Sequence, residues 1–321
     1  MKLPRIVAAG LASVLLAAVS LTVVSSQSQA LVVGVGDQNP ALFGNELFQR
    51  LDPQRVRYIA PYDAVLDSRQ RANVDAWMGA AYAAGKEIVV AFNPPVGVRC
   101  PNLGRARGCR PVSAAKYKKA FKAFHKRYPY VSIIQPWNEV NSLTQPTFHH
   151  PEAVVAYYDA VRRACRGCTV LGADIQDLPN AKGYAKALLK QFHKRGIRAP
   201  QLWGVHNYSD TNRFVSAKRS MLGRLVKILP GKIWLTETGG VYRFQPQNAR
   251  QSFRPDAARQ ARAMEAVFSA AQRYRRDVER IYVYHWFGAD PTNRWDSGVL
   301  DLAGAPRAAY AVLERHAKLF R

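Results

Sequence analysis

The sequence predicts a single-domain α/β fold, a (β/α)8 TIM barrel, and three observations support that prediction. Short apolar or β-branched runs alternate eight times with longer amphipathic stretches, which is the pattern of repeated βα units around a parallel sheet. The segment after residue 30 is about 291 residues long, the usual size of such a barrel. No linker, repeat or low-complexity tract divides it, so we expect one domain over residues 31–321.

The predicted strands and helices alternate along the whole of that segment. Strands are expected at 31–35, 56–59, 87–92, 131–135, 169–173, 202–206, 232–236 and 281–285. Helices are expected at 41–51, 69–84, 114–128, 152–165, 181–195, 217–229, 256–274 and 307–318. The competing fold, an open doubly wound sheet, requires a glycine-rich phosphate-binding turn after its first strand. Gly34 and Gly36 lie there without a third glycine or a helix start, so the barrel is favoured.

The first thirty residues have the layout of a secretory signal peptide. Lys2 and Arg5 precede an apolar run over 6–24, and Ser28-Gln29-Ala30 forms a small-x-small cleavage pattern. The apolar run also approaches the length of a membrane span, so an uncleaved anchor is the alternative. The cleavage pattern favours removal after Ala30. We therefore expect a secreted, extracellular chain without a membrane segment.

The four cysteines form two local pairs, Cys100 with Cys109 and Cys165 with Cys168. An even cysteine count behind a signal peptide favours disulfides in an oxidising compartment. The Cys-x-x-Cys spacing of the second pair also suits a redox or zinc half-site, but no second such pair and no nearby histidine pair supply the remaining zinc ligands. We expect two structural disulfides and no metal.

The charge balance is strongly basic, with 47 Lys and Arg against 22 Asp and Glu. Loss of Lys2 and Arg5 would lower the net charge from +25 to +23. Such a surface attracts anionic polymers, although a solvated basic surface without a partner is the plainer interpretation. No nucleic-acid-binding motif accompanies the charge, so we expect no specific nucleic-acid partner, and we expect a monomer.

Two glutamates follow predicted strands at the rim where barrels carry their catalytic residues. Glu139 lies after the fourth strand and Glu237 after the seventh, so they are expected to face each other across the barrel mouth. A pair of carboxylates is what cleavage of a glycosidic bond requires. Polar and aromatic residues that suit a sugar follow the same strand ends: Asn138, His206, Tyr208 and Trp286.

The segments Trp137-Asn138-Glu139 and Thr236-Glu237-Thr238-Gly239 resemble the signature of glycoside hydrolase clan A, and the resemblance follows strand order over the whole chain after residue 30. Its character is that of the retaining enzymes of families 39 and 5. The resemblance implies that Glu139 is the acid/base and Glu237 the nucleophile. It further implies supporting roles: Asn138 binds the sugar 2-hydroxyl, Arg57 holds the nucleophile ionised, His206 and Tyr208 form the strand-six pair, and Trp286 is the platform under the sugar.

Two positions depart from that pattern. Val140 stands where many members have proline after the acid/base, and Asn93 ends the third strand where some families place histidine. We include Asn93 among the expected substrate-binding residues, and we expect Trp137 to pack in the core because tryptophan is usually highly buried. Neither departure removes a carboxylate.

The predicted activity is retaining hydrolysis of a β-linked oligo- or polysaccharide by double displacement, without metal or organic cofactor. Retention predicts carboxyl groups roughly 5–5.5 Å apart. One alternative is a barrel that binds cell-wall or extracellular polysaccharide without cleaving it. Another is a nucleic-acid-binding surface protein, which would account for the charge but not for the strand-end residues.

Overall fold

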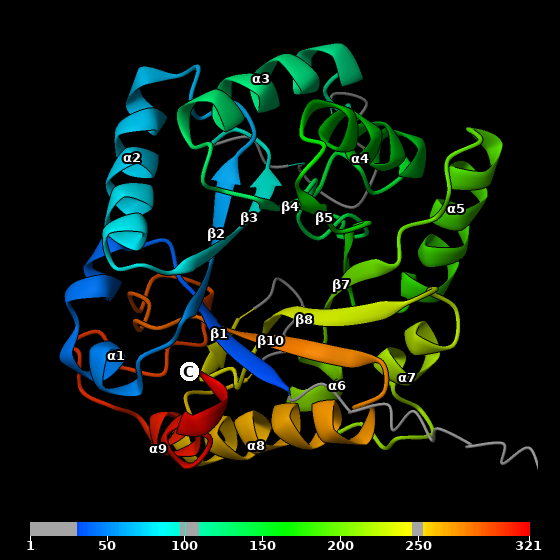
Figure 1. Ribbon diagram of the computed structural model, residues 1–321. Helices are drawn as coiled ribbons and strands as arrows, with labels where there is room; N and C mark the ends of the chain where they lie inside the picture. Colours follow the sequence, from blue (N-terminus) through cyan, green and yellow to red (C-terminus); the bar gives the residue numbers. More distant parts are fainter. Residues whose placement is uncertain (1–30, 97–99, 101–108, 246–252) are drawn as a thin grey trace, which may run out of the picture.

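A ring of helices surrounds a barrel of parallel strands in the computed structural model (Figure 1). The structure describes residues 31–96, 100, 109–245 and 253–321. Its barrel strands are β1 (Val32–Gly36), β2 (Arg55–Pro61), β3 (Glu87–Asn93), β4 (Ile133–Gln135), β5 (Thr169–Val170), β6 (Asp174–Gln176), β7 (Leu202–His206), β8 (Lys232–Thr238) and β10 (Val278–Tyr284). Its helices are α1 (Glu46–Leu51), α2 (Ser68–Ala83), α3 (Ala114–Arg127), α4 (Pro151–Ala164), α5 (Ala181–Lys194), α6 (Tyr208–Asn212), α7 (Met221–Val226), α8 (Ala257–Arg273) and α9 (Ala308–Arg315).

The sheet closes on itself through a strand that is broken in the middle. The strand order is β5-β4-β3-β2-β1-β10-β8-β7-β6, and every neighbouring pair is parallel. The chain from β5 to β6 joins the two ends, because Leu171 N–H donates to the carbonyl of Ile134 in β4 and Gly172 N–H donates to that of Leu202 in β7. The predicted eight-stranded barrel is therefore confirmed, with β5 and β6 as two halves of its fifth strand.

The barrel interior consists of an apolar layer below a polar one, as strand alternation requires. The lower layer is a cluster of Val89, Ile133, Leu171, Trp234 and Tyr282. Two residues further along their strands, the same interior face carries Gln135, Thr236 and Tyr284. The polar layer therefore lies at the carboxyl ends of the strands, where the loops begin.

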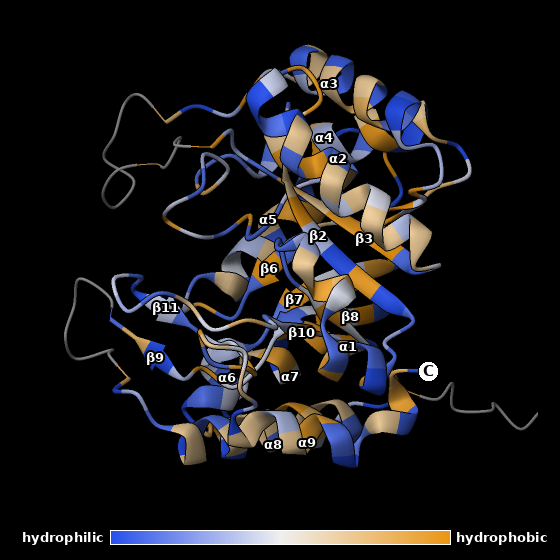
Figure 2. Cartoon of the chain, turned by 90° about the vertical axis from the view of Figure 1, so that its left-hand side faces the viewer, coloured by the Kyte–Doolittle hydropathy of each residue, from blue (hydrophilic) through white to orange (hydrophobic). Residues whose placement is uncertain are grey.

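The helices bury one face against the outside of the sheet. In α3, Tyr117, Phe121 and Phe124 are buried, while the lysines point to solvent. Figure 2 shows apolar strands at the centre, and it shows long loops and a two-stranded ribbon gathered at one end of the barrel. That ribbon pairs β9 (Arg243–Phe244) with β11 (Trp295–Asp296).

Most predicted helices lie where the sequence indicated, with two exceptions. The helix expected over 41–51 is divided at Asn45 into a 3-10 helix, Pro40–Gly44, and α1, and the other difference lies between β7 and β8. The helix expected over 217–229 is shorter and spans Met221–Val226, because Ser220 caps its first turn by accepting the N–H of Gly223. A second short helix, α6, follows β7 directly and was not predicted.

Both expected disulfides are present, Cys100–Cys109 and Cys165–Cys168. Cys165 ends α4, so the second bridge closes the turn that leads into β5. The proposed signal peptide, residues 1–30, lies outside the described residues. Across the residues that the structure describes, none of the helices has the length and apolar character needed to span a bilayer.

Candidate active site

Glu139 and Glu237 lie side by side at the carboxyl end of the barrel. Glu139 is in the loop that follows β4, and Glu237 is near the end of β8. One carboxylate oxygen of Glu139 lies within 4.8 Å of a carboxylate oxygen of Glu237. The two strand ends therefore bring the predicted pair together.

Glu237 is held from two sides by donors that belong to the barrel. Arg57 Nη1 donates to Glu237 Oε2 at 2.8 Å, and Tyr208 Oη donates to Oε1 at 3.3 Å. Burial raises the pKa of the Tyr208 hydroxyl well above its ordinary value, and the nearby Glu237 charge raises it further. The hydroxyl therefore stays protonated and able to donate.

Arg57 connects four acceptors below the pair. It is completely buried, and besides Glu237 it donates to Asn138 Oδ1 at 2.7 Å, Gln135 Oε1 at 2.7 Å and Asp174 Oδ2 at 3.1 Å. Burial alone lowers the pKa of a guanidinium, but the charges of Asp174 and Glu237 outweigh it and raise the pKa of Arg57 above its ordinary value. The fixed planar geometry of arginine suits this bridging role.

Asp174 anchors this network from the opposite wall. Its Oδ1 accepts hydrogen bonds from Gln135 Nε2 and, at 2.7 Å, from Thr236 Oγ1. A Cβ atom at Gly204 would overlap the Asp174 carboxylate, so only glycine fits at that point of β7. With Arg57, Asp174 therefore forms a buried ion pair whose remaining acceptor positions are satisfied.

Glu139 is held by its loop. Its φ angle of 46° lies in the left-handed region, which is uncommon for a side chain other than glycine, asparagine or aspartate. Backbone hydrogen bonds on both sides fix it there: Asn138 N–H donates to Phe92 O at 2.7 Å, and Val140 N–H donates to Asp174 O at 2.9 Å. The carboxylate accepts from Gln176 Nε2 at 2.8 Å.

His206 lies between the two carboxylates. Its Nδ1 is 3.2 Å from Glu139 Oε1 and 3.9 Å from Glu237 Oε2. Burial lowers the pKa of the imidazole, but the neighbouring charge of Glu237 and the hydrogen bond with Glu139 reverse that effect, so the pKa is raised above its ordinary value. His206 is therefore able to donate a hydrogen bond toward the pair.

A cavity of about 520 Å³ opens beside Glu139, over the ends of β1 to β4 and β10. We call it the tyrosine cleft; its wall includes Gln38, Tyr58, Asn93, Asn138, Glu139 and Tyr284. Its volume is that of a small-molecule binding site. Asn93 lines it as expected, and its amide oxygen accepts a hydrogen bond from Gln145 Nε2 at 3.1 Å.

Trp286 does not line this cleft, so the prediction of a sugar platform at that residue is wrong. The indole is completely buried against Phe48 and Tyr310, and its Nε1 donates to Asn45. The strand β10 ends at Tyr284, one residue earlier than expected, and Asp37 then accepts the backbone N–H of Trp286 and turns the chain outward. The aromatic ring from the end of β10 that lines the cleft is Tyr284.

A second cavity of about 410 Å³ lies over β6 to β8. We call it the basic cleft; its wall includes Gln176, Tyr208, Arg213, Arg219, Phe253 and Trp295. Asp177 lies at its base and accepts the backbone N–H groups of Ser209 and Asp210, so this carboxylate caps α6. Since Gln176 and Tyr208 contact the two glutamates, the basic cleft begins at the pair.

Among the residues that the structure describes, two groups of side chains have a spacing that could hold a metal ion. One group is Glu139, His206 and Glu237, but there Arg57 already supplies a positive charge beside Glu237. The other is His125 with Cys165 and Cys168, whose sulfur atoms are joined in a disulfide and are not thiolate ligands. The donor sets therefore give no support for a structural or catalytic metal at either place.

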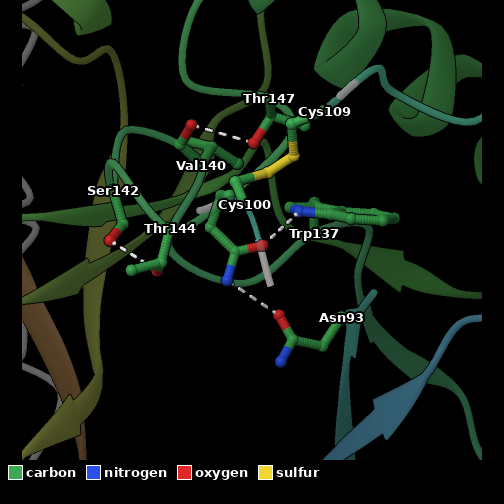
Figure 3. The surroundings of a disulfide bond; sticks show 9 residues. Asn93, Cys100, Cys109, Trp137, Val140, Ser142, Thr144 and Thr147 are labelled. Carbon is green, nitrogen blue, oxygen red and sulfur yellow. Dashed lines mark hydrogen bonds between the residues drawn. A yellow bond between two sulfur atoms is a disulfide. The ribbon is translucent and has the colours of Figure 1, made fainter. Parts of the chain in front are cut away.

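Several site residues were not singled out from the sequence. Gln176 and Gln135 each contact a predicted residue, and each lies in a strand that ends at the rim. The signal for Tyr284 was present in the sequence, because it lies two residues after Tyr282 and therefore on the same face of its strand. Trp137, expected to pack, is buried, and its indole donates to Gln145 Oε1 at 3.0 Å (Figure 3).

No family model and no curated protein matches the chain. Solved structures match its fold. A GH10 endoxylanase retrieved from a sugarcane soil metagenome aligns with a TM-score of 0.59 and 13% identity, over 92% of this chain and 98% of its own. A xylanase from Paenibacillus barcinonensis gives 0.62 and 11%, over 88% and 95%. A family 39 glycoside hydrolase from Bacteroides cellulosilyticus WH2 gives 0.56 and 15%, over 91% and 64%. The chain has the barrel fold of these solved structures.

Proposed function

We propose that this protein is a secreted retaining glycoside hydrolase that cleaves a β-linked oligo- or polysaccharide. One observation carries the proposal: two glutamates meet at the carboxyl end of the barrel, with one carboxylate oxygen of each within 4.8 Å of the other. Retaining enzymes place their carboxyl groups about 5–5.5 Å apart, whereas inverting enzymes leave a wider gap for water. The fold shared with xylanases and a family 39 enzyme supports the same proposal.

The surroundings of the pair suit two different roles. Glu237 accepts hydrogen bonds from Arg57 and Tyr208, so it serves as the carboxylate that attacks the anomeric carbon. Glu139 lines the tyrosine cleft, so it serves as the acid that protonates the departing oxygen. Glu139 then takes a proton from the water that releases the sugar from Glu237. Asn138, held by Arg57, serves to bind the sugar hydroxyl next to the nucleophile.

The test is an assay of purified protein against aryl β-glycosides and plant and microbial polysaccharides, with Glu237→Ala in parallel. We expect turnover in the wild type that the variant lacks, and proton NMR of the first product should show the β-anomer. An α-anomer would overturn the retaining assignment. Binding of glycans without turnover on any of them, unchanged by Glu237→Ala, would instead indicate a non-catalytic binding barrel.

A further inference from the structure

The two clefts beside the glutamate pair differ in charge. Among the described residues that line the tyrosine cleft, Glu139 is the one charged side chain. The basic cleft has Arg213 and Arg219 on its wall, and both side chains are exposed. A saccharide that passes through the glutamate pair therefore meets a neutral surface on one side and a cationic surface on the other.

The acidic residues of the basic cleft are held by other hydrogen bonds, and neither forms an ion pair with Arg219. Asp177 accepts the backbone N–H groups that begin α6. Asp210 accepts Ser220 Oγ at 2.7 Å and the backbone N–H groups of Met221 and Leu222 at 3.0 and 2.9 Å. Both carboxylates therefore accept hydrogen bonds from the backbone at the start of the helices beside the cleft. No ion pair within the described part of the chain includes Arg219.

The same contacts hold Arg219 in place. It directly precedes Ser220, whose hydroxyl both binds Asp210 and caps α7. The backbone at Arg219 is further fixed by its N–H, which donates to Ser216 O at 2.9 Å. A cation on an anchored backbone loses less conformational freedom when it binds a ligand than one on a free loop.

The charge bias extends over the whole segment that builds this side of the barrel. Residues 178–236 contain twelve lysines and arginines and one acidic residue, Asp210. The field of such a segment attracts anions toward the cleft and repels cations. The cleft also contains an aromatic ring suited to a sugar, because Trp295 lines it.

We propose that the basic cleft binds an anionic sugar unit of the saccharide, and that Arg219 pairs with its carboxylate or sulfate group. This inference rests on the proposed function for its saccharide ligand, and it adds the chemical class. Charge-assisted hydrogen bonds from arginine to a planar carboxylate or to a sulfate give both attraction and orientation. The tyrosine cleft then binds those sugar units of the saccharide that carry no charge or whose charged group points to solvent.

The test is calorimetric binding to the Glu139→Gln protein, which holds the ligand without turning it over. Three probes separate the chemistries: a β-1,4-linked trisaccharide of glucuronic acid, cellotriose, and sulfated cellotriose. We expect at least one of the two charged probes to bind roughly tenfold more tightly than cellotriose. Arg219→Gln should remove most of that difference in affinity. Arg219→Gln should change the affinity for cellotriose by less than about twofold.

The matched control is Arg224→Gln, which removes one exposed positive charge from α7 outside the cleft wall. It should leave the affinity for all three probes nearly unchanged. Equal losses in the two variants, equal binding of charged and neutral probes, or no binding of any probe would overturn the inference. If the wild type fails to hydrolyse glycans while the Arg219-dependent binding persists, the hydrolase proposal fails and the anionic-sugar site stands.

Discussion

Glu139 and Glu237 face the same space, but they are held in different ways. Glu237 lies within a strand, its side chain is 8% exposed, and its partners Arg57 and Tyr208 are buried. Glu139 lies in a loop, its side chain is 18% exposed, and its backbone has a left-handed φ. The position of Glu237 is therefore fixed by the barrel interior, whereas the position of Glu139 is fixed by the backbone of one loop. This difference predicts how each responds to substitution.

The largest effect should come from replacing the glutamates themselves. Glu237→Gln should lower kcat/KM by more than about 10⁴-fold on every substrate, because no nucleophile remains. Glu139→Gln should cost about 10³-fold on a polysaccharide. A 2,4-dinitrophenyl glycoside separates the effects of the two substitutions more clearly, because its leaving group departs without being protonated.

On that substrate, Glu139→Gln should show a burst of dinitrophenol, since the first step stays fast and the second lacks its base. Added azide should then restore steady turnover. The absorbance of dinitrophenol reports both results. A burst in Glu237→Gln and none in Glu139→Gln would reverse the two assignments.

The next largest effect concerns Arg57, which belongs to the Glu237 side of the comparison. Arg57→Met would leave Glu237 and Asp174 as buried carboxylates without their cation. We expect a loss of about 3–5 kcal/mol in the free energy of unfolding, measured by urea denaturation at neutral pH. The control Arg127→Met breaks an exposed pair with Asp75 and should cost less than about 1 kcal/mol.

A smaller effect distinguishes the donors to each glutamate. Tyr208→Phe removes a buried hydroxyl from Glu237, and we expect a loss of about 10²-fold in kcat. Gln176→Met removes a donor from the more exposed Glu139, where water can replace it, so the loss should stay below about tenfold. Equal losses in the two variants would show that the strand and the loop hold their glutamates equally firmly.

The smallest effect concerns Asp177, which is connected to both glutamates. It follows Gln176, the donor to Glu139, and it caps the helix that carries Tyr208, the donor to Glu237. Burial raises the pKa of Asp177 from 3.8 to about 7. The folded chain therefore binds more protons than the unfolded chain between these values, so the free energy of unfolding falls as pH rises through that window. Asp177→Asn cannot ionise and should flatten the fall by on the order of 1–2 kcal/mol. The measurement is the free energy of unfolding from urea denaturation at pH 5 and 7.5. An equal change between these pH values in the wild type and in Asp177→Asn would contradict this prediction.

The sequence predicted most of the fold because its elements have strong local signals. Eight hydrophobic runs separated by amphipathic helices indicate a barrel, and the strand-end rule then placed Glu139, Glu237, His206 and Tyr208 at one rim. The place of Arg57 beside Glu237 was implied by the family resemblance. The strand-end prediction holds even if a strand end is misplaced by a residue or two, because a residue in the following loop still lies at the carboxyl end of the barrel.

The residues that sequence reasoning missed depend on finer geometry. Tyr284 and Trp286 show this, because one residue in the end of β10 decides which ring faces the cleft. The contact of Gln176 with Glu139 depends on a break inside the fifth strand, which no local sequence pattern indicates. The contacts of α6 likewise arise from Asp177 across the loop, so they follow from tertiary structure.

The hydrogen-bond chain in Figure 3 makes one tryptophan an optical reporter of the active site. Trp137 donates to Gln145, and Gln145 in turn donates to Asn93 in the wall of the tyrosine cleft. Indole fluorescence responds to a change in the acceptor of its N–H group. If a sugar binds the Asn93 amide, we expect the emission of Trp137 to change, so that the intrinsic fluorescence of the unlabelled protein reports binding in this cleft.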